Sequence, residues 1–407
     1  MHFDTLSGHR VRRMPLTAAL LALLAGTASA QGPLSRNLVY TQTNNPNGNA
    51  ILAYTRGVDG KLTPLPSGPF PTGGLGLTST FALGPFDSDQ EVILDQTGQR
   101  LFTVNGGSNS ISVFDVMSDG SLKAVVGSPF SSGGSGPVSI GLIDDILCVV
   151  NQNEDPGHEG SGTPNYATFH VASNGRLSPR PRSVYPVEIG SSPSQALTVA
   201  PDRLVFGADF LGGILRSFRV GEGGRLVRAA AMPLPASIFA GAGAPPFPLG
   251  LAAHPSRNLL YVGFVTINEI GVYEYSDSGA FRFVASAPDS GKAVCWLRTN
   301  HDGGRLYASN TADPSITVYD IQTNPRKPVE IQHLNYMSTG GGFQLELDST
   351  GRFLHVVTQQ SAPTSDASAN AIHVFSIAGD GRLTEVPSSP TLLPVPSGTR
   401  PQGIAAL

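Results

Sequence analysis

Short stretches in which apolar and polar residues alternate recur from about residue 36 to the end of the chain. Clear examples are residues 111–114, 270–273 and 316–319. The alternation has the two-residue period of a half-buried β-strand, and no window keeps the period of a helix over several turns. The chain is therefore predicted to be all-β.

A tight turn follows many of these strands, and it repeats at a spacing of about 50–60 residues, which is typical of propeller blades. It occurs at residues 59–62, 119–122, 174–177, 223–226, 278–281 and 380–383, with a degenerate copy at 324–327. Its Asp-Gly and Asn-Gly pairs favour two-residue hairpin loops, because both central residues of such a loop need positive φ. Three strands before each turn and one after it give seven units of four strands.

The two ends of the repeat region match different parts of one unit. Residues 38–41 resemble a second strand, and residues 401–407 resemble a first strand. The last strand is therefore predicted to complete the blade that the first residues begin, which closes the ring and protects the sheet edges. The prediction is a seven-bladed β-propeller with four antiparallel strands per blade, in a single domain spanning residues 31–407.

The first 30 residues have the pattern of a signal peptide. Arg10, Arg12 and Arg13 precede an apolar run at residues 16–26, and the small residues 28–30 supply a cleavage site. We expect cleavage after Ala30 and a secreted or periplasmic protein. The Arg12-Arg13 pair leaves a twin-arginine route open beside the general one, and an uncleaved membrane tether is the alternative.

Composition and charge narrow the partners. The formal net charge of −4 argues against nucleic acid, and no membrane span is expected after processing. Cys148 and Cys295 fall on distant blades, so we expect two buried free thiols. The chain has no H-E-x-x-H, C-x-x-C or G-x-S-x-G motif. We therefore expect a monomer with no cofactor and no metal, although the polar loop at residues 153–160 offers a weak oxygen-and-imidazole alternative.

Candidate chemistry is predicted where two sets of loops meet around one mouth of the central channel, because loops on a rigid scaffold often carry function. These loops join the second strand to the third, and the fourth strand to the next blade. Asp209 and Glu154 are candidate acid or base residues, and Lys292 and Arg400 are candidates for holding a carboxylate or phosphate. The structural alternative is that these charges pair with one another and link blades.

Three asparagines occupy equivalent ends of predicted second strands. Asn105, Asn151 and Asn310 are candidate substrate-binding residues, since an amide can both donate and accept hydrogen bonds. The alternative interpretation is that each one caps its own loop.

Residues 306–310 and 315–319, the Asp-Gly-x-Leu turns and the Gly127-Ser128-Pro129-Phe130 segment resemble the seven-bladed lactonase family, which includes the propeller-type 6-phosphogluconolactonase and carboxymuconate cyclase. The resemblance implies hydrolysis or cyclisation of a small lactone or carboxylate. The family's catalytic histidine has no counterpart at residues 192–195, which read Ser-Pro-Ser-Gln. The alternative is a non-catalytic propeller that binds a protein or glycan partner, with exposed apolar residues such as Phe247 and Phe264.

Overall fold

The computed structural model describes residues 37–77, 88–152, 154–155, 158–159, 163–239, 247–360, 366–396 and 398–407. The predicted signal peptide, residues 1–30, lies outside the described residues. The chain divides into Met1–Gly32 and Pro33–Leu407, and the fold described below is that of the second unit.

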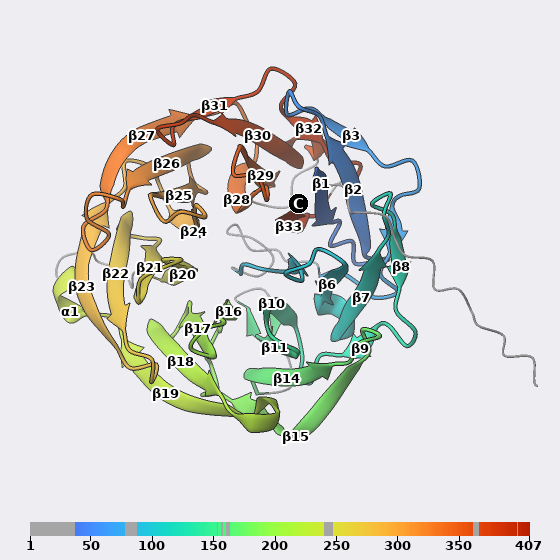
Figure 1. The fold of residues 1–407 in the computed structure, drawn as a ribbon, viewed down its shortest axis with the longest axis horizontal. Coiled ribbons are helices and arrows are strands. Elements are labelled where there is room, and N and C mark those ends of the chain that lie inside the picture. Colours follow the sequence, from blue (N-terminus) through green and yellow to red (C-terminus); the bar gives the residue numbers. More distant parts are fainter. Residues whose placement is uncertain are drawn as a thin grey trace, which may run out of the picture. The chain divides into compact units, whose positions relative to one another are not determined.

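Seven antiparallel sheets of four main strands are arranged in a ring, as Figure 1 shows, and this confirms the predicted seven-bladed β-propeller. The inner strands are β33 (Gln402–Ala406), β5 (Val92–Leu94), β10 (Pro137–Ile143), β16 (Leu197–Val199), β20 (Pro248–Ala253), β24 (Val294–Thr299) and β28 (Gly341–Leu347). The second strands are β1 (Leu38–Gln42), β6 (Arg100–Asn105), β11 (Ile146–Asn151), β17 (Leu204–Asp209), β21 (Leu259–Phe264), β25 (Arg305–Asn310) and β29 (Phe353–Gln359).

The two outer positions of each blade complete the sheets. The third strands are β2 (Ala50–Arg56), β7 (Ser110–Val116), β14 (Asn165–Val171), β18 (Ile214–Val220), β22 (Glu269–Tyr275), β26 (Ser315–Asp320) and β30 (Ala371–Ile377). The fourth are β3 (Leu62–Pro64), β8 (Leu122–Ala124), β15 (Leu177–Pro186), β19 (Leu226–Pro233), β23 (Phe281–Pro288), β27 (Val329–Asn335) and β31 (Leu383–Glu385). Short additional elements are β4 (Phe70–Pro71), β9 (Phe130–Ser131), β32 (Thr391–Leu392), the hairpin β12 (Glu154–Asp155) and β13 (His158–Glu159), and the helix α1 (Ala236–Phe239).

We number the blades I to VII in the order of their second strands, so that blade I contains β1 and β33. The pairing of β1 with β33 closes the ring, as predicted from the sequence, and it aligns Val39 with Ala406. The Thr41 hydroxyl donates to the Gly403 carbonyl at 2.7 Å. A buried ion pair also joins blades I and VII, with 2.8 Å between Arg56 Nη2 and Asp348 Oδ2. The closure therefore combines strand pairing with a buried charge pair.

The repeated hairpin turns differ in detail from the sequence prediction. In blade II the Met117 amide donates to the Ser121 carbonyl, and the Gly120 amide donates back to the Met117 carbonyl, both at 2.8 Å. The loop therefore has three residues. Only its glycine has positive φ (Gly120, 84°), whereas Asp119 is not among the positive-φ residues. The predicted two-residue loop was wrong because a type I turn followed by a left-handed glycine satisfies the same Asp-Gly pair.

Each of several hairpin turns is bound by a side chain of the preceding blade. The shared feature is a buried hydroxyl that donates to a turn carbonyl. These inter-blade hydrogen bonds are Tyr40 to Gly120, Thr168 to Gly224, Ser217 to Gly279, Tyr261 to Pro325 and Tyr307 to Gly381. The turn repeat that revealed the blades is therefore also the element that joins neighbouring blades.

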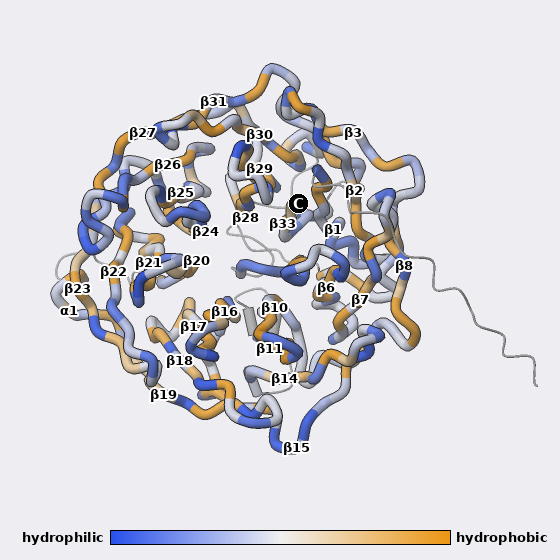
Figure 2. The backbone as a smooth tube through the Cα atoms, viewed as in Figure 1, coloured by the Kyte–Doolittle hydropathy of each residue, from blue (hydrophilic) through white to orange (hydrophobic). Residues whose placement is uncertain are grey.

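The core consists of apolar layers between successive blades, and polar and apolar positions alternate along the strands in Figure 2. Cys148 in β11 and Cys295 in β24 lie in separate clusters of this core, and both are buried free thiols, as predicted. Burial raises the pKa of Cys148 to about 12. These thiols therefore act as small apolar side chains.

The turns between first and second strands share a polar residue that accepts hydrogen bonds from the turn backbone. Asp95 Oδ1 accepts from the Gln99 amide at 2.9 Å. Asn300 Oδ1 occupies the equivalent place in blade VI and accepts from the Arg305 amide at 2.8 Å. The residue at this position therefore stabilises its own turn.

Candidate functional site

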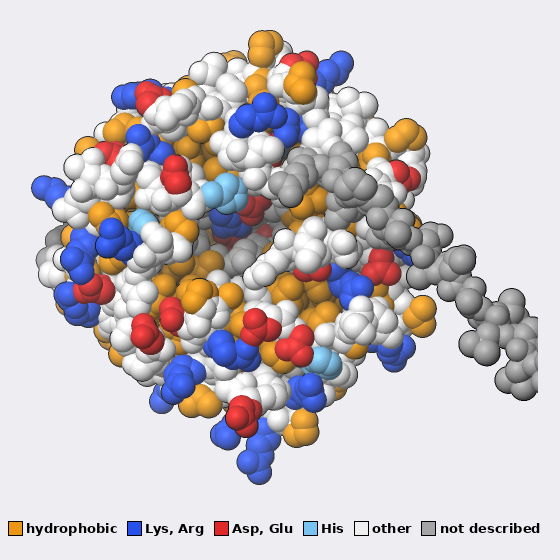
Figure 3. Space-filling view, viewed as in Figure 1, with side chains coloured by type: hydrophobic (Ala, Val, Ile, Leu, Met, Phe, Trp, Pro, Cys, Tyr) orange, Lys and Arg blue, Asp and Glu red, His pale blue; other side chains and the backbone are white. Residues whose placement is uncertain are grey.

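A cavity of about 770 Å³ lies at the centre of the described ring, between the inner strands. Its lining comes from inner strands and from the turns that lead to the second strands, and it includes Gln90, Asp95, Asp145, Arg298, His301 and Glu346. Figure 3 shows the centre of the ring hollowed on the face in view, with basic and acidic side chains inside. This cavity lies at the channel mouth opposite to the one at which the sequence analysis placed the candidate chemistry.

A short segment before β5 crosses the channel axis. We call residues 88–91 the crossing segment. The Trp296 indole and the Gln344 amide, from blades VI and VII, both donate to the Ser88 carbonyl. On the other side, the Ile140 amide of blade III donates to the Gln90 carbonyl at 3.0 Å. The crossing segment is therefore bound by blades on opposite sides of the ring.

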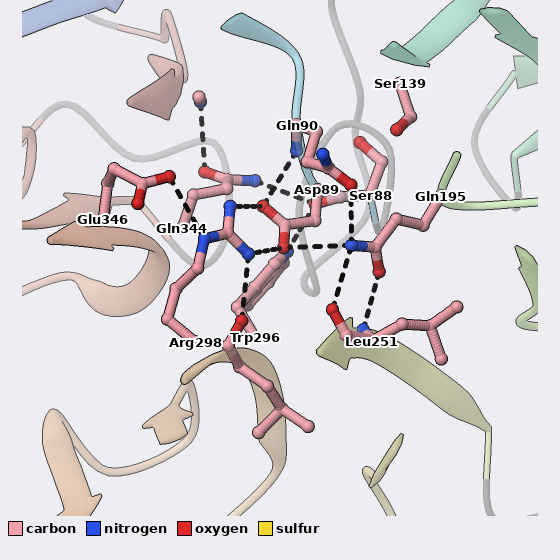
Figure 4. Close-up of polar contacts among 12 residues, drawn as sticks. Ser88, Asp89, Gln90, Ser139, Gln195, Leu251, Trp296, Arg298, Gln344 and Glu346 are labelled. Carbon is pink, nitrogen blue, oxygen red and sulfur yellow. Dashed lines mark hydrogen bonds and ion pairs between the residues drawn. The ribbon is translucent and has the colours of Figure 1, made fainter. Parts of the chain in front are cut away.

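The crossing segment brings a carboxylate to the guanidinium of Arg298, as Figure 4 shows. Asp89 is 1% exposed, and its two oxygens lie 2.6 and 3.1 Å from Nη1 and Nη2 of Arg298. Arg298 Nε also lies 3.1 Å from Glu346 Oε2. One guanidinium thus binds two carboxylates from two other parts of the chain, in the bidentate geometry that arginine favours.

Glu346 is the most exposed member of this cluster, and it lines the cavity. Its side chain is 30% exposed, and its Oε1 accepts a hydrogen bond from the Leu347 amide at 3.1 Å. Burial raises the pKa of Glu346 above the usual glutamate range, although the positive charge of Arg298 opposes the shift. A carboxyl with a raised pKa on the wall of a cavity is suited to proton transfer near neutral pH.

A second glutamate of the crossing segment is fully buried. Glu91 Oε1 accepts from the Ser88 hydroxyl at 2.8 Å and from the Gln344 amide at 2.9 Å, whereas Oε2 has no hydrogen-bond partner among the described residues. Burial raises the pKa of Glu91 well above its usual value, and the nearby Asp89 charge adds to the shift. Both effects favour the protonated form of this carboxyl in the folded protein.

This burial predicts a pH-dependent cost that glutamine would remove. Above the ordinary carboxyl pKa, the unfolded chain releases the Glu91 proton while the folded chain keeps it, so stability falls as pH rises. We expect Glu91→Gln to raise the free energy of unfolding at pH 8 by about 1 kcal/mol or more and to leave it nearly unchanged at pH 4. Urea denaturation at both pH values measures this. The exposed Glu222→Gln is the control, and an equal effect at both pH values would contradict the assignment.

The structure places Asp209 in a buried ion pair. Its Oδ2 lies 2.7 Å from Arg216 Nη1, and its Oδ1 accepts from the Ser192 and Gly212 amides, both at 2.9 Å. Arg216 is itself 2% exposed, and it also pairs with Glu188 at 2.5 Å. Asp209 thus pairs with a charge that the sequence analysis did not consider, within its own blade.

Among the described residues, no ion pair joins Lys292 and Arg400, two of the other predicted charged residues. Lys292 is exposed, and its backbone amide donates to Asp313 Oδ1 at 2.7 Å. Arg400 is 2% exposed, and its carbonyl accepts from the Asn44 side chain at 3.1 Å. The backbone of Glu154 lies in β12, but its side chain is outside the described residues. Their roles in binding or catalysis stay predictions.

The three asparagines are all buried and form local hydrogen bonds. Asn105 Nδ2 donates to Ser112 at 2.8 Å, Asn310 Nδ2 donates to Thr317 at 3.0 Å, and Asn151 Nδ2 donates to Asn165 at 3.0 Å. Each residue thus joins the end of its second strand to the neighbouring third strand. These contacts are those of the loop-capping alternative, and substrate binding by the asparagines stays a prediction.

Phe247 and Phe264, which the partner-binding alternative expects to be exposed, are partly and fully buried. Phe264 is 0% exposed, so that expectation was wrong, because its ring packs within the core between blades IV and V. Phe247 is half-buried and stacks on Phe210, with 4.6 Å between ring centroids.

Asp89, Arg298 and Glu346 were not among the site residues predicted from the sequence. The sequence held one signal for two of them, a charged residue at an inner-strand position of the repeat. Arg298 and Glu346 occupy this position, paired with Tyr307 and His355 of the second strands. In blade I the equivalent position, opposite Tyr40, holds Ala405.

Comparisons with known proteins agree with this architecture. The sequence model of the family described as "Lactonase, 7-bladed beta-propeller" matches residues 248–397. No curated protein sequence matches the chain. No helix among the described residues is long and apolar enough to cross a membrane.

Several solved structures share the fold at low sequence identity. The periplasmic gluconolactonase of Pseudomonas aeruginosa is 15% identical with a TM-score of 0.66, and the match covers 90% of this chain and 98% of that one. A protein from Bacteroides uniformis, provisionally named as a 6-phosphogluconolactonase, is 14% identical with a TM-score of 0.67. The match covers 90% of this chain and 99% of that one. A hypothetical selenium-binding protein from Sulfolobus tokodaii is 13% identical with a TM-score of 0.60. The match covers 92% of this chain and 94% of that one. The resemblance to the seven-bladed β-propeller lactonase family is therefore confirmed by the match at residues 248–397, and the rest of the described chain shares the fold of these structures.

Proposed function

We propose that this protein hydrolyses a small lactone in the central cavity, with Glu346 as the general base. The observation that carries the proposal is the position of Glu346, a partly exposed carboxyl with a raised pKa on the cavity wall, held by Arg298. The family match at residues 248–397 supports the lactone as the substrate class. The likeness in fold to a periplasmic gluconolactonase is compatible with it.

The proposed reaction needs one group that first accepts and then returns a proton. The Glu346 carboxylate takes a proton from water as the water oxygen attacks the lactone carbonyl carbon. The tetrahedral intermediate collapses, the ring carbon–oxygen bond breaks, and the ring oxygen receives the proton from Glu346. The product is an open-chain hydroxy acid. Arg298 acts as a positioning residue, because its Nε binds Glu346 Oε2 and its Nη atoms bind Asp89.

Substitution of the proposed base tests the proposal. We expect Glu346→Gln to lower kcat about 10²- to 10⁴-fold, the usual contribution of general acid–base catalysis. In the parent protein the rate should fall as pH drops through the raised Glu346 pKa, so this acid limb should lie above the usual carboxyl range. The assay is lactone hydrolysis followed by acid release, corrected for spontaneous ring opening.

The control keeps the same change of side chain at a distance from the cavity. Glu330, in the outer strand β27, accepts a hydrogen bond from the Ser290 amide, so Glu330→Gln is the matched variant. It should keep parental kcat. Full activity of a folded Glu346→Gln protein would refute the role of Glu346. Absence of turnover by the parent on a broad lactone panel would favour the binding of a protein or glycan partner.

We also propose that residues 1–30 direct export to the periplasm or the medium. The basic start, the apolar run and the small residues before Gln31 support this. One structurally similar protein is a periplasmic gluconolactonase. Mass spectrometry of the chain purified from its native compartment should find Gln31 at the N-terminus, and an intact Met1 would contradict the proposal.

A further inference from the structure

We infer that the cavity selects uncharged lactones and discriminates against lactones that carry a phosphate. The inference rests on the proposed function, because it names the substrate class of the same site. It is carried by the charges that line the cavity and by the partners that neutralise some of them.

We call Asp89, Arg298 and Glu346 the floor of the cavity, and this floor carries excess negative charge. Among the described residues, Arg298 is the cation of this floor, and it binds two carboxylates, Asp89 and Glu346. With both carboxylates ionised, the cluster has a net charge of −1. The bidentate pairing with a carboxylate that is 1% exposed also occupies the guanidinium edge that would otherwise bind a phosphate. An incoming phosphate would therefore have to displace buried Asp89.

The cationic side chains near the rim are paired as well. Arg100 lines the cavity, but its Nη2 lies 2.9 Å from Asp115 Oδ1. Arg203, which pairs with Asp144, does not line the cavity. Among the described residues, therefore, the rim offers a phosphate no arginine that lacks a carboxylate partner.

Two rim carboxylates add to the negative charge. Asp95 lies in the turn after β5, and no Lys, Arg or His ion pair with it is found among the described residues. Among the described residues, the ion-pair partner of Asp145 is the His170 imidazole, with 2.8 Å between Nδ1 and Oδ2. Counted as formal charges with a neutral imidazole, the Arg298 cluster contributes −1 and Asp95 and Asp145 contribute −1 each. The described residues at the cavity thus carry about three excess negative charges.

Excess charge of one sign acts on substrate and product differently. A neutral lactone meets no electrostatic barrier, whereas a phosphate dianion is repelled by a concave surface that focuses the field. The hydroxy acid formed by ring opening is an anion, so the same field favours its departure. The lining therefore predicts both selectivity for neutral substrates and weak inhibition by the product.

The test compares two probes, glucono-δ-lactone and its 6-phosphate. For the full chain at low ionic strength, we expect kcat/KM to be at least about tenfold higher for the neutral lactone. The ratio should shrink in 0.5 M salt, because screening weakens the repulsion. Equal or faster turnover of the phosphorylated lactone would overturn the inference while leaving the proposed function standing. Failure to hydrolyse either lactone would overturn the proposed function, and this inference with it.

Variants that remove carboxylate charges test whether the selectivity arises from the cavity lining. Asp95→Asn should preserve the turn, because Asn300 fills the equivalent place in blade VI. We expect Asp95→Asn combined with Asp145→Asn to lower the ratio of kcat/KM for the neutral lactone to kcat/KM for its 6-phosphate about fivefold. The control removes the same charge away from the cavity, through Glu222→Gln combined with Asp277→Asn, and it should leave the ratio unchanged. An equal change in both double variants would overturn the assignment to the lining.

Discussion

Removal of residues 401–407 is expected to abolish the stability of the whole ring. The deletion takes away β33, the inner strand of blade I, and with it the pairing to β1 and the buried side chain of Ile404. It also removes the Gly403 amide that donates to Gln344 of blade VII at 3.2 Å. The expected loss is about 5 kcal/mol or more, which equals the total stability of many domains.

Thermal denaturation followed by circular dichroism measures this loss. The shortened chain should be insoluble or should lose its cooperative transition at the parental temperature. A graded variant, Ile404→Ala, should cost about 2–5 kcal/mol through the cavity it leaves. The exposed Val58→Ala should stay within about 0.5 kcal/mol of the parent. A shortened protein that melts like the parent would show that ring closure contributes little.

Replacement of Asp209 by asparagine is expected to destabilise the fold by about 3–5 kcal/mol, because the change removes the buried partner of Arg216 and leaves its guanidinium only the exposed Glu188 carboxylate. Both side chains are at most 2% exposed and lie 2.7 Å apart. A second substitution should recover part of the loss, so Asp209→Asn combined with Arg216→Met should be more stable than Asp209→Asn alone.

Urea denaturation of the two variants and of the parent gives these free energies. Lactone turnover, measured on the same folded samples, distinguishes the structural role of Asp209 from the catalytic one predicted from the sequence. A stable Asp209→Asn protein that has lost turnover would support the catalytic role. An unstable protein whose folded fraction keeps its activity would support the structural one.

The ring could be predicted from the sequence because its determinants repeat. Seven turns, seven sets of alternating strands and the complementary ends each give the same answer, so local errors do not change the count. The turn geometry was less predictable. The Asp-Gly pair fits both a two-residue and a three-residue loop, and the local sequence does not distinguish the two.

The charged cluster of the cavity could not be predicted in this way. Asp89 lies in a connection between blades that follows no repeat, and its position depends on hydrogen bonds to Gln195 and Arg298, which are over one hundred residues away in the sequence. Arg298 and Glu346 place charges at inner-strand positions and so depart from the repeat, but this departure does not show that the two side chains meet each other and Asp89. Which side chains meet at the channel axis depends on how the closed ring places all seven inner strands. The repeat pattern along the sequence does not give that information.

The hydroxyl groups that bind the hairpin turns of neighbouring blades have a consequence for the way the molecule loses structure. In an open array of repeats, terminal units can fray independently of the others. Here Tyr40, Tyr261 and Tyr307 each anchor the next unit, and the Arg56–Asp348 pair joins the last unit to the first. No unit is terminal, so the slowest amide hydrogens of all seven should exchange with solvent through one common opening event, at similar rates around the circle.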